Sequence, residues 1–161
     1  MGLAVLDIDG VLADVRHRLR FVQSRPKDWD GFFAAAPDDT PLPRGLERAT
    51  ELAASGDVVY LTGRPERCRD DTERWLLAHG FPAARVVMRP DRDRRPARLF
   101  KLEQVRRLAA STRVDVVVDD DHLVVDTLAA AGFAVEHAQW MVDDAPQQAS
   151  LFDAQEREGR T

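Results

Sequence analysis

Acidic side chains directly follow two apolar runs that lie far apart in the chain. Asp7 and Asp9 end the run that begins at residue 3, and Asp119 and Asp120 end the run that begins at residue 114. Carboxylates brought together repel each other, by roughly 4 kcal/mol for a unit pair about 4 Å apart at an effective dielectric of about 20. A divalent cation with oxygen ligands removes this conflict, and Mg²⁺ suits a few carboxylates combined with waters and phosphate oxygens. The pattern therefore predicts a Mg²⁺ site at Asp7, Asp9, Asp119 and Asp120.

Two of these carboxylates are placed for covalent chemistry on a phosphoester. An ionised Asp7, stabilised by the cation and a nearby ammonium, could attack phosphorus and form an aspartyl phosphate. Asp9 stands beside the turn-forming Gly10, and it could protonate the leaving oxygen and then activate water. Two identical side chains would then begin the reaction in opposite protonation states, which requires different surroundings for each.

Groups that bind phosphate are also present. A third apolar run ends at Thr62, Gly63 and Arg64, where a hydroxyl and backbone N–H groups can hold phosphate oxygens. Lys101 could supply a fixed positive charge. It is one of only two lysines among 23 basic residues, so its presence is unusual for this chain. The alternative interpretation is that Lys101 is a surface residue early in a helix.

The elements that must position these side chains follow from hydrophobic periodicity. Continuous apolar runs predict strands over residues 3–8, 58–62, 85–88, 114–118 and 133–136. Apolar residues at spacings of three and four predict helices over residues 42–55, 66–79, 99–110 and 123–131. Their alternation predicts an α/β fold, a doubly wound, Rossmann-like parallel sheet with helices on both faces. In such sheets ligands bind outside the carboxyl ends of the strands, where all the candidate residues stand.

Composition and length restrict the class of protein. The chain has 161 residues with 44% hydrophobic and 32% charged, typical of one globular domain, and no apolar run approaches the ~20 residues that span a bilayer. Cys68 is the only cysteine, which excludes an internal disulfide and a cysteine-based zinc cluster and favours the reducing cytoplasm. A net charge of −5 argues against coating nucleic acid by charge alone.

We expect a domain over residues 1–142 and an acidic, glutamine-rich tail over residues 143–161 that lies outside the core. Within the tail, Gln148, Leu151 and Phe152 belong to a QASLF segment. This segment resembles the short peptide by which bacterial repair proteins dock on the sliding clamp. The alternative is an apolar pair that folds back onto the domain.

The ordered motifs resemble a known superfamily. DIDGVLAD (7–14), LTGR (61–64), Lys101 and VVVDDD (116–121) are similar, in this order, to the four motifs of the haloacid dehalogenase (HAD) phosphotransferases. The resemblance covers roughly residues 3–140. Val11 stands where many members have threonine.

The resemblance implies a role for each matched residue. Asp7 would be the nucleophile and a Mg²⁺ ligand, and Asp9 the general acid and base, with its backbone carbonyl on the metal. Thr62 and Lys101 would contact the phosphoryl group. Asp120 or Asp119 would complete the metal shell.

Many members of the superfamily carry a cap domain over the site. The segments at 15–44 and 65–100 are too short to hold one here, so we expect the capless type, whose open site admits a polymer end or is closed by another subunit. Among capless members, the chain looks most similar to the phosphatase half of polynucleotide kinase-phosphatases. This implies removal of terminal phosphates, typically 3′, from nucleic acid. No GxxxxGK[ST] phosphate-binding loop of a kinase occurs, so we expect a stand-alone phosphatase.

Two further segments have alternative interpretations. Trp29, Phe32 and Phe33, near several arginines, could stack on bases or pack a small helix onto the core. Residues 85–107 carry nine basic against three acidic residues, either a guide for a phosphate backbone or a solvated face that pairs with the acidic tail.

Other classes of function stay open at this point. A HAD phosphatase for a nucleotide or another small phosphometabolite would carry the same motifs, and so would a binding domain that kept the fold without catalysis. A bacterial receiver domain also uses aspartates, threonine and lysine, but there the acidic cluster precedes the phosphate-accepting aspartate. Asp14, Asp121 and Asp126 are interpreted as helix-start or surface carboxylates, and the four histidines show no metal-ligand spacing.

Overall fold

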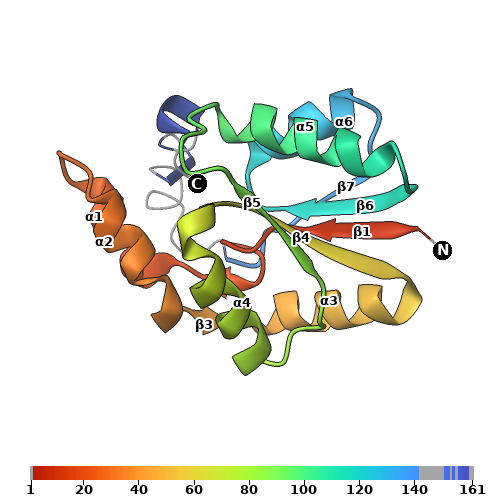
Figure 1. Cartoon of the computed structure of the whole chain (residues 1–161), viewed down its shortest axis with the longest axis horizontal. Helices are drawn as coiled ribbons and strands as arrows, with labels where there is room; N and C mark the ends of the chain where they lie inside the picture. The colour runs from red at the N-terminus through yellow and green to blue at the C-terminus, as the bar shows by residue number, and fades with distance from the viewer. Residues whose placement is uncertain (1, 142–150, 153, 155, 160–161) are drawn as a thin grey trace.

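The predicted apolar runs form the strands of one parallel sheet (Figure 1). The computed structural model describes residues 2–141, 151, 152, 154 and 156–159. The strand order is β5-β4-β1-β6-β7, which confirms the doubly wound α/β prediction. The strands are β1 (Leu3–Leu6), β4 (Asp57–Pro65), β5 (Arg85–Arg89), β6 (Val114–Asp119) and β7 (Val135–His137).

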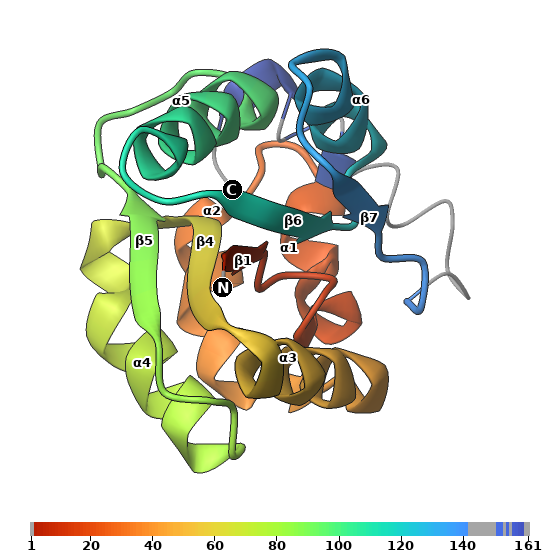
Figure 2. The same cartoon turned by 90° about the vertical axis from the view of Figure 1, so that its right-hand side faces the viewer.

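Helices cover both faces of this sheet (Figure 2). On one face lie α3 (Pro43–Ser55) and α4 (Arg69–Ala78), and on the other lie α5 (Ala97–Ala109) and α6 (His122–Ala130). Each face has its own core of buried apolar side chains. The predicted helix ends differ by up to three residues, most at residue 66, because Glu66–Cys68 form a short 3-10 turn before α4.

The register of β1 brings the candidate residues to one edge. Leu6 pairs with Tyr60 of β4 and with Val118 of β6. Asp7 follows Leu6, and its backbone N–H donates to the carbonyl of Val118 at 2.9 Å. Since all three strands are parallel, the residues that follow their last apolar positions meet at the same end of the sheet.

A short insert lies beyond this end of the sheet (Figure 1). It begins and ends in the antiparallel strands β2 (Ala13–Asp14) and β3 (Thr40–Pro41). Between them are the helices α1 (Arg20–Gln23) and α2 (Trp29–Ala34), with the 3-10 turns η1 (Arg16–Arg18) and η2 (Ala36–Asp38). Two helices of this length are much smaller than a cap domain, as expected for the capless type.

The aromatic residues of the insert are part of the core. Trp29, Phe32 and Phe33 are buried and contact one another, with the Trp29 and Phe33 rings stacked 6.0 Å apart. The structure thus supports packing, rather than base stacking, for these rings.

The expectation that the tail lies outside the core is wrong for its described part. Leu151 and Ala154 are 1% and 0% exposed, and they belong to the core that also contains Ala4 and Leu6 of β1. Phe152 is partly buried with its ring edge toward His122, 5.9 Å between centroids. Gln148 lies outside the described residues. The structure therefore favours the apolar pair that folds back, and clamp docking would require Leu151 to leave the core.

Among the described residues, no helix combines the length and the apolar content that crossing a membrane requires.

Candidate active site

Asp7, Lys101 and Asp119 are in direct contact at the carboxyl end of the sheet. The Nζ atom of Lys101 lies 3.0 Å from Oδ2 of Asp7 and 2.6 Å from Oδ2 of Asp119. All three residues are less than 5% exposed. Lys101 is on the buried face of α5, which rules out its interpretation as a surface residue. Burial by itself lowers the pKa of the ammonium, but the charges of Asp119 and Asp7 outweigh it and raise the pKa, so Lys101 is a fixed cation.

Three carboxylates gather around this lysine. Asp7, Asp119 and Asp120 each offer one carboxylate oxygen, and these oxygens all lie within 4.8 Å of one another. The structure thus brings both residues of the acidic pair to the cluster. The Asp9 carboxylate lies outside this group, contrary to the expected cluster of four. Its backbone carbonyl, which the resemblance assigns to the metal, stays a prediction.

The turn after Asp9 allows the close approach of Asp120. Gly10 has φ +81°, and a Cβ at this position would lie 1.9 Å from a carboxylate oxygen of Asp120. Only glycine therefore fits. The carbonyl of Ile8 accepts from the N–H groups of Leu12 and Ala13 at 2.8 and 2.9 Å, which reverses the chain at this point.

The electrostatics of the cluster fit a divalent cation. Burial, together with the charges of Asp119 and Asp9, outweighs the lowering by Lys101 and raises the pKa of Asp7 to about 8. Burial and the charges of Asp7 and Asp119 also raise the pKa of Asp120 well above its usual range. Three ionised carboxylates and one ammonium leave two net negative charges in a buried volume. An oxygen-only donor set with this excess is typical of Mg²⁺ sites.

The Asp9 carboxylate is held by two arginines instead. Its Oδ1 accepts from Nε and Nη2 of Arg64 at 2.9 and 2.6 Å and from Nη2 of Arg18 at 2.8 Å. Burial raises the pKa of Asp9, but the charges of Arg18 and Arg64 outweigh it and lower the pKa to about 2. Asp7 and Asp9 are thus two identical side chains in different surroundings. The directions of their pKa shifts are, however, the reverse of the expected starting states, which were an ionised Asp7 and a protonated Asp9.

A second carboxylate completes this arginine cluster. Asp39, fully buried before β3, accepts from Nε and Nη2 of Arg18, both at 2.8 Å, and from Nη2 of Arg64 at 3.1 Å. His17 Nε2 lies 2.7 Å from the same carboxylate. Sequence reasoning missed Arg18 and Asp39, because both lie in the irregular insert and no motif contains them.

The LTGR segment lies at the same edge. Thr62 is 1% exposed, and its Oγ1 accepts from the backbone N–H of Arg64 at 3.1 Å, which leaves the hydroxyl proton available to an acceptor. Gly63 is buried in β4. The guanidinium of Arg64 is committed to Asp9, Asp39 and, at 3.2 Å, the Thr72 hydroxyl.

Asp121 has the structural role expected from the sequence. Its carboxylate accepts from the backbone N–H of Leu123 and caps α6, while its own N–H donates to Oδ1 of Asp119 at 3.0 Å. Asp121 therefore helps to orient one of the clustered carboxylates.

The sheet order, the buried aspartate after β1, the lysine on α5 and the acidic pair after β6 define a phosphatase of the haloacid dehalogenase superfamily. The family model described as the polynucleotide kinase PNKP phosphatase domain matches residues 2–140. The chain belongs to this family and is a phosphatase domain.

Solved structures show the same fold. One chain of the Pnkp1/Rnl/Hen1 RNA repair complex is 21% identical with a TM-score of 0.68, and the match covers 85% of this chain and 42% of that one. The class C acid phosphatase of Bacillus anthracis, solved with tungstate bound, is 18% identical with a TM-score of 0.59 and coverages of 95% and 79%. This chain thus spans less than half of the matched chain of the RNA repair complex.

A short sequence similarity points to another phosphatase. A Bacillus cereus protein described as a candidate nucleotidase is 36% identical over 44 residues, which are 27% of this chain and 23% of that protein.

Proposed function

We propose that this chain is a Mg²⁺-dependent phosphomonoesterase that removes terminal phosphates, typically 3′, from nucleic acid through an aspartyl phosphate on Asp7. The observation that carries this proposal is the contact of Asp7 with Lys101 inside the cluster of Asp119 and Asp120. A carboxylate held by a fixed cation in a buried, polar site is suited to attack phosphorus. Asp7, Asp119 and Asp120 would hold Mg²⁺, which would neutralise the charge of the carboxylates and of the phosphate oxygens.

The first step transfers the phosphoryl group to the protein. An Asp7 oxygen forms a bond to phosphorus, the bond to the ester oxygen breaks, and its electron pair leaves with that oxygen. The ammonium of Lys101, the hydroxyl of Thr62 and the backbone of Gly63 are placed to bind the phosphoryl oxygens. Asp9 gives the leaving oxygen its proton, so that the product is an alcohol.

The second step restores Asp7. Asp9, now ionised, takes a proton from water as the water oxygen attacks phosphorus, and the Asp7 oxygen leaves as a carboxylate with release of phosphate. The arginine cluster favours this ionised state of Asp9. To donate in the first step, Asp9 has to gain a proton when substrate arrives. A phosphate that draws Arg18 or Arg64 toward itself would allow this.

A nucleic acid substrate is supported by the family and by the surroundings of the site. The matching family is the polynucleotide kinase PNKP phosphatase domain, and one similar chain belongs to the Pnkp1/Rnl/Hen1 RNA repair complex. Arg92 and Arg94, in the loop after β5, are exposed at the carboxyl edge, where they can attract a phosphate backbone. The single, partly buried cysteine fits a cytoplasmic location, which we include in the proposal.

A nucleotide or other small phosphometabolite is the second candidate substrate, and the similarity to the Bacillus cereus protein favours it. A non-catalytic binding domain is less well supported, because the buried Asp7–Lys101 pair and the acidic cluster are costly to keep without a cation and a substrate.

A panel of phosphoesters tests the proposal. Turnover of a 3′-phosphorylated oligonucleotide, a 3′-mononucleotide and p-nitrophenyl phosphate is compared with Mg²⁺ and with a chelator. We expect the highest kcat/KM for the oligonucleotide and loss of all turnover with chelator. A higher kcat/KM for the mononucleotide would favour the second candidate, and turnover unaffected by chelator would contradict the metal site.

A further inference from the structure

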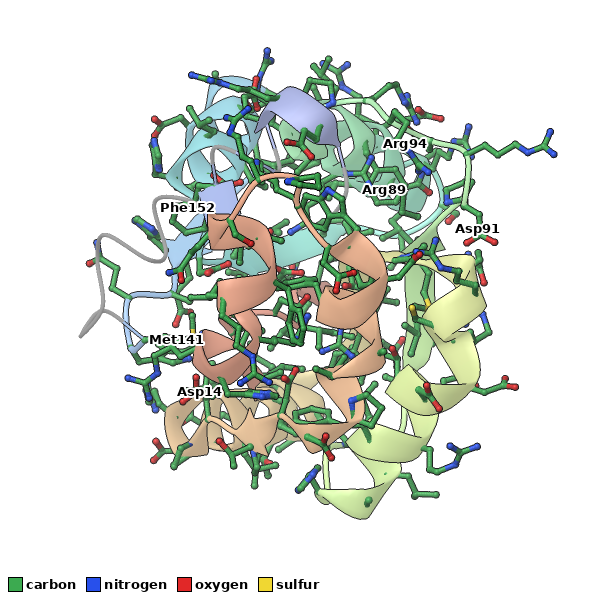
Figure 3. The ribbon with its side chains drawn as sticks, turned by 90° about the vertical axis from the view of Figure 1, so that its left-hand side faces the viewer. Asp14, Arg89, Asp91, Arg94, Met141 and Phe152 are labelled. Carbon is green, nitrogen blue, oxygen red and sulfur yellow. The ribbon has the colours of Figure 1, made fainter. Side chains whose placement is uncertain are left out.

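The described part of the tail forms a strap along the carboxyl edge of the sheet. We use the term strap for residues 151, 152, 154 and 156–159. Near its start, Phe152 (labelled in Figure 3) lies beside His122 of α6. Gly159 has φ +58°, and a Cβ there would lie 2.2 Å from the carbonyl oxygen of Arg94 in the loop after β5. The strap therefore reaches from α6 to the loop that precedes α5.

Carboxylates of the strap contact cationic and N–H groups on two separate elements. Glu158 accepts from the indole Nε1 of Trp29 at 2.8 Å and lies 2.7 Å from Nζ of Lys27. Glu156 accepts from Nε of Arg98 at 2.8 Å. Trp29 and Lys27 belong to the insert, whereas Arg98 belongs to the first turn of α5. The strap thus joins the two segments that flank the catalytic edge.

The catalytic side chains are buried in this structure. Asp7, Asp9 and Asp120 are each 4% exposed, and Lys101 is 3% exposed. With so little of Asp7 exposed, a neighbouring segment that moves aside would give a phosphoester better access to it. The insert is fixed to the sheet by the buried pairs of Arg18 with Asp9 and of Arg64 with Asp39. The strap is fixed by partly exposed ion pairs and a few apolar contacts, so it can leave with the sheet intact.

The groups under the strap are those that bind a phosphodiester backbone. An ammonium, a guanidinium and an indole N–H all donate to anionic oxygens and carry no acceptor in this role. Arg98 is three residues before Lys101, so the two lie on the same side of α5, one turn apart. A phosphate next to the one held by Lys101 would therefore come close to Arg98. Lys27 is the only other lysine in a chain that otherwise uses arginine.

We propose that Lys27, Trp29 and Arg98 form the surface that binds the phosphate backbone of a single-stranded nucleic acid next to its terminal phosphate, and that Glu156 and Glu158 of the strap occupy this surface until substrate displaces them. The inference rests on the proposed function, since it assumes a polynucleotide end at Asp7. It adds an intramolecular competitor that closes the site when no strand is bound.

Two sets of variants test the shared surface. In Glu156→Gln/Glu158→Gln the strap loses its charges, and we expect kcat/KM to rise roughly fivefold or more for both a 3′-phosphorylated oligonucleotide and p-nitrophenyl phosphate. The control is Glu47→Gln/Glu51→Gln on α3, which removes the same charge from exposed arginine pairs. We expect no change in the control.

The second set of variants distinguishes two possibilities. Either the strap and the nucleic acid bind the same surface, or the strap only covers the site and its binding surface has no part in binding substrate. Lys27→Ala and Arg98→Ala also weaken the attachment of the strap. If the strap only covers the site, both variants should therefore turn over both substrates faster. A shared surface predicts faster or equal turnover of p-nitrophenyl phosphate together with a KM for the oligonucleotide raised roughly tenfold. Equally faster turnover of both substrates would overturn the proposal. Unchanged kinetics for both substrates would overturn it as well.

A measurement without turnover complements these assays. In Asp7→Asn, the oligonucleotide should speed hydrogen exchange of the amides at 156–159, while the control peptide in α3 stays unchanged. Unchanged exchange at saturating oligonucleotide would overturn the displacement. The proposed function fails in a different way: the wild-type protein would turn over p-nitrophenyl phosphate and leave every oligonucleotide intact.

Discussion

Two nitrogens of the Arg64 guanidinium donate hydrogen bonds to the Asp9 carboxylate, at 2.6 and 2.9 Å, although the two residues are 55 positions apart in the chain. The same guanidinium reaches Asp39 at 3.1 Å. Asp9 therefore stands in a cationic environment, while Asp7, two residues earlier, stands in an anionic one. In the proposed mechanism, Asp7 acts on phosphorus and Asp9 on protons, and this separation gives the two carboxylates the different surroundings that such roles need.

Removal of Arg64 should destabilise the fold. Arg64→Gln leaves two buried carboxylates with one fewer cation, so we expect a loss of about 3 kcal/mol in the free energy of unfolding at pH 7. Because the pKa of Asp9 is lowered to about 2, this contribution is present at neutral pH and disappears as the pH falls from about 4 to about 2. Urea unfolding at several pH values measures it. Arg44→Gln, which breaks an exposed pair with Glu47, should cost less than about 0.5 kcal/mol.

Asp9→Asn should strongly reduce turnover while the nucleophile Asp7 stays in place. The amide cannot shuttle the proton, and we expect kcat to fall by a factor on the order of 10² to 10⁴. An ester with a good leaving group needs less protonation, so p-nitrophenyl phosphate should lose less kcat than the oligonucleotide does. Equal losses for both esters would argue against proton donation by Asp9.

Asp120→Asn should weaken the dependence on Mg²⁺ without removing the nucleophile. The variant loses one of the three clustered carboxylates, and we expect the Mg²⁺ concentration for half-maximal turnover to rise by roughly tenfold or more. A Mg²⁺ titration of kcat measures this shift. Asp126→Asn on α6, outside the cluster, is the control, and an unchanged titration in Asp120→Asn would exclude Asp120 as a ligand.

Mg²⁺ should stabilise the protein more at alkaline than at acidic pH. Burial raises the pKa of Asp7 to about 8, so the metal-free folded state binds more protons than the unfolded state. The contribution of Asp7 to the free energy of unfolding is therefore greatest below about pH 4, and it is lost as the pH rises from about 4 through about 8. A bound cation removes the repulsion that follows ionisation. Thermal unfolding with and without Mg²⁺ should show a larger difference in Tm at pH 8 than at pH 5; equal differences would contradict the metal site.

The sheet and its site-bearing edge could be predicted because local signals specify them. Continuous apolar runs such as 114–118 indicate strands buried on both faces, and polar residues after such strands meet at one edge. Lys101 could be singled out because lysine is rare in this chain. The close approach of Gly10 and Asp120 agrees with the motif, although only the structure shows the contact.

The arginine cluster and the strap could not be predicted. The partners of Arg18 and Arg64 depend on how the insert folds over the sheet, and its short helices carry no long periodic pattern. The sequence of the tail predicts an acidic, solvent-exposed segment, because Leu151 and Ala154 alone, although both are buried in the core, form no hydrophobic pattern. Contacts between distant segments decide both cases.

Phosphorylation of Asp7 is the event on which the account depends. The protein is mixed with a 3′-phosphorylated oligonucleotide and Mg²⁺, quenched in acid during turnover, and the peptide that contains Asp7 and Asp9 is sequenced by mass spectrometry. We predict a phosphoryl group on Asp7, none on Asp9, and none in Asp7→Asn, which should also be inactive. Turnover in Asp7→Asn equal to that of the wild-type protein would contradict the covalent mechanism.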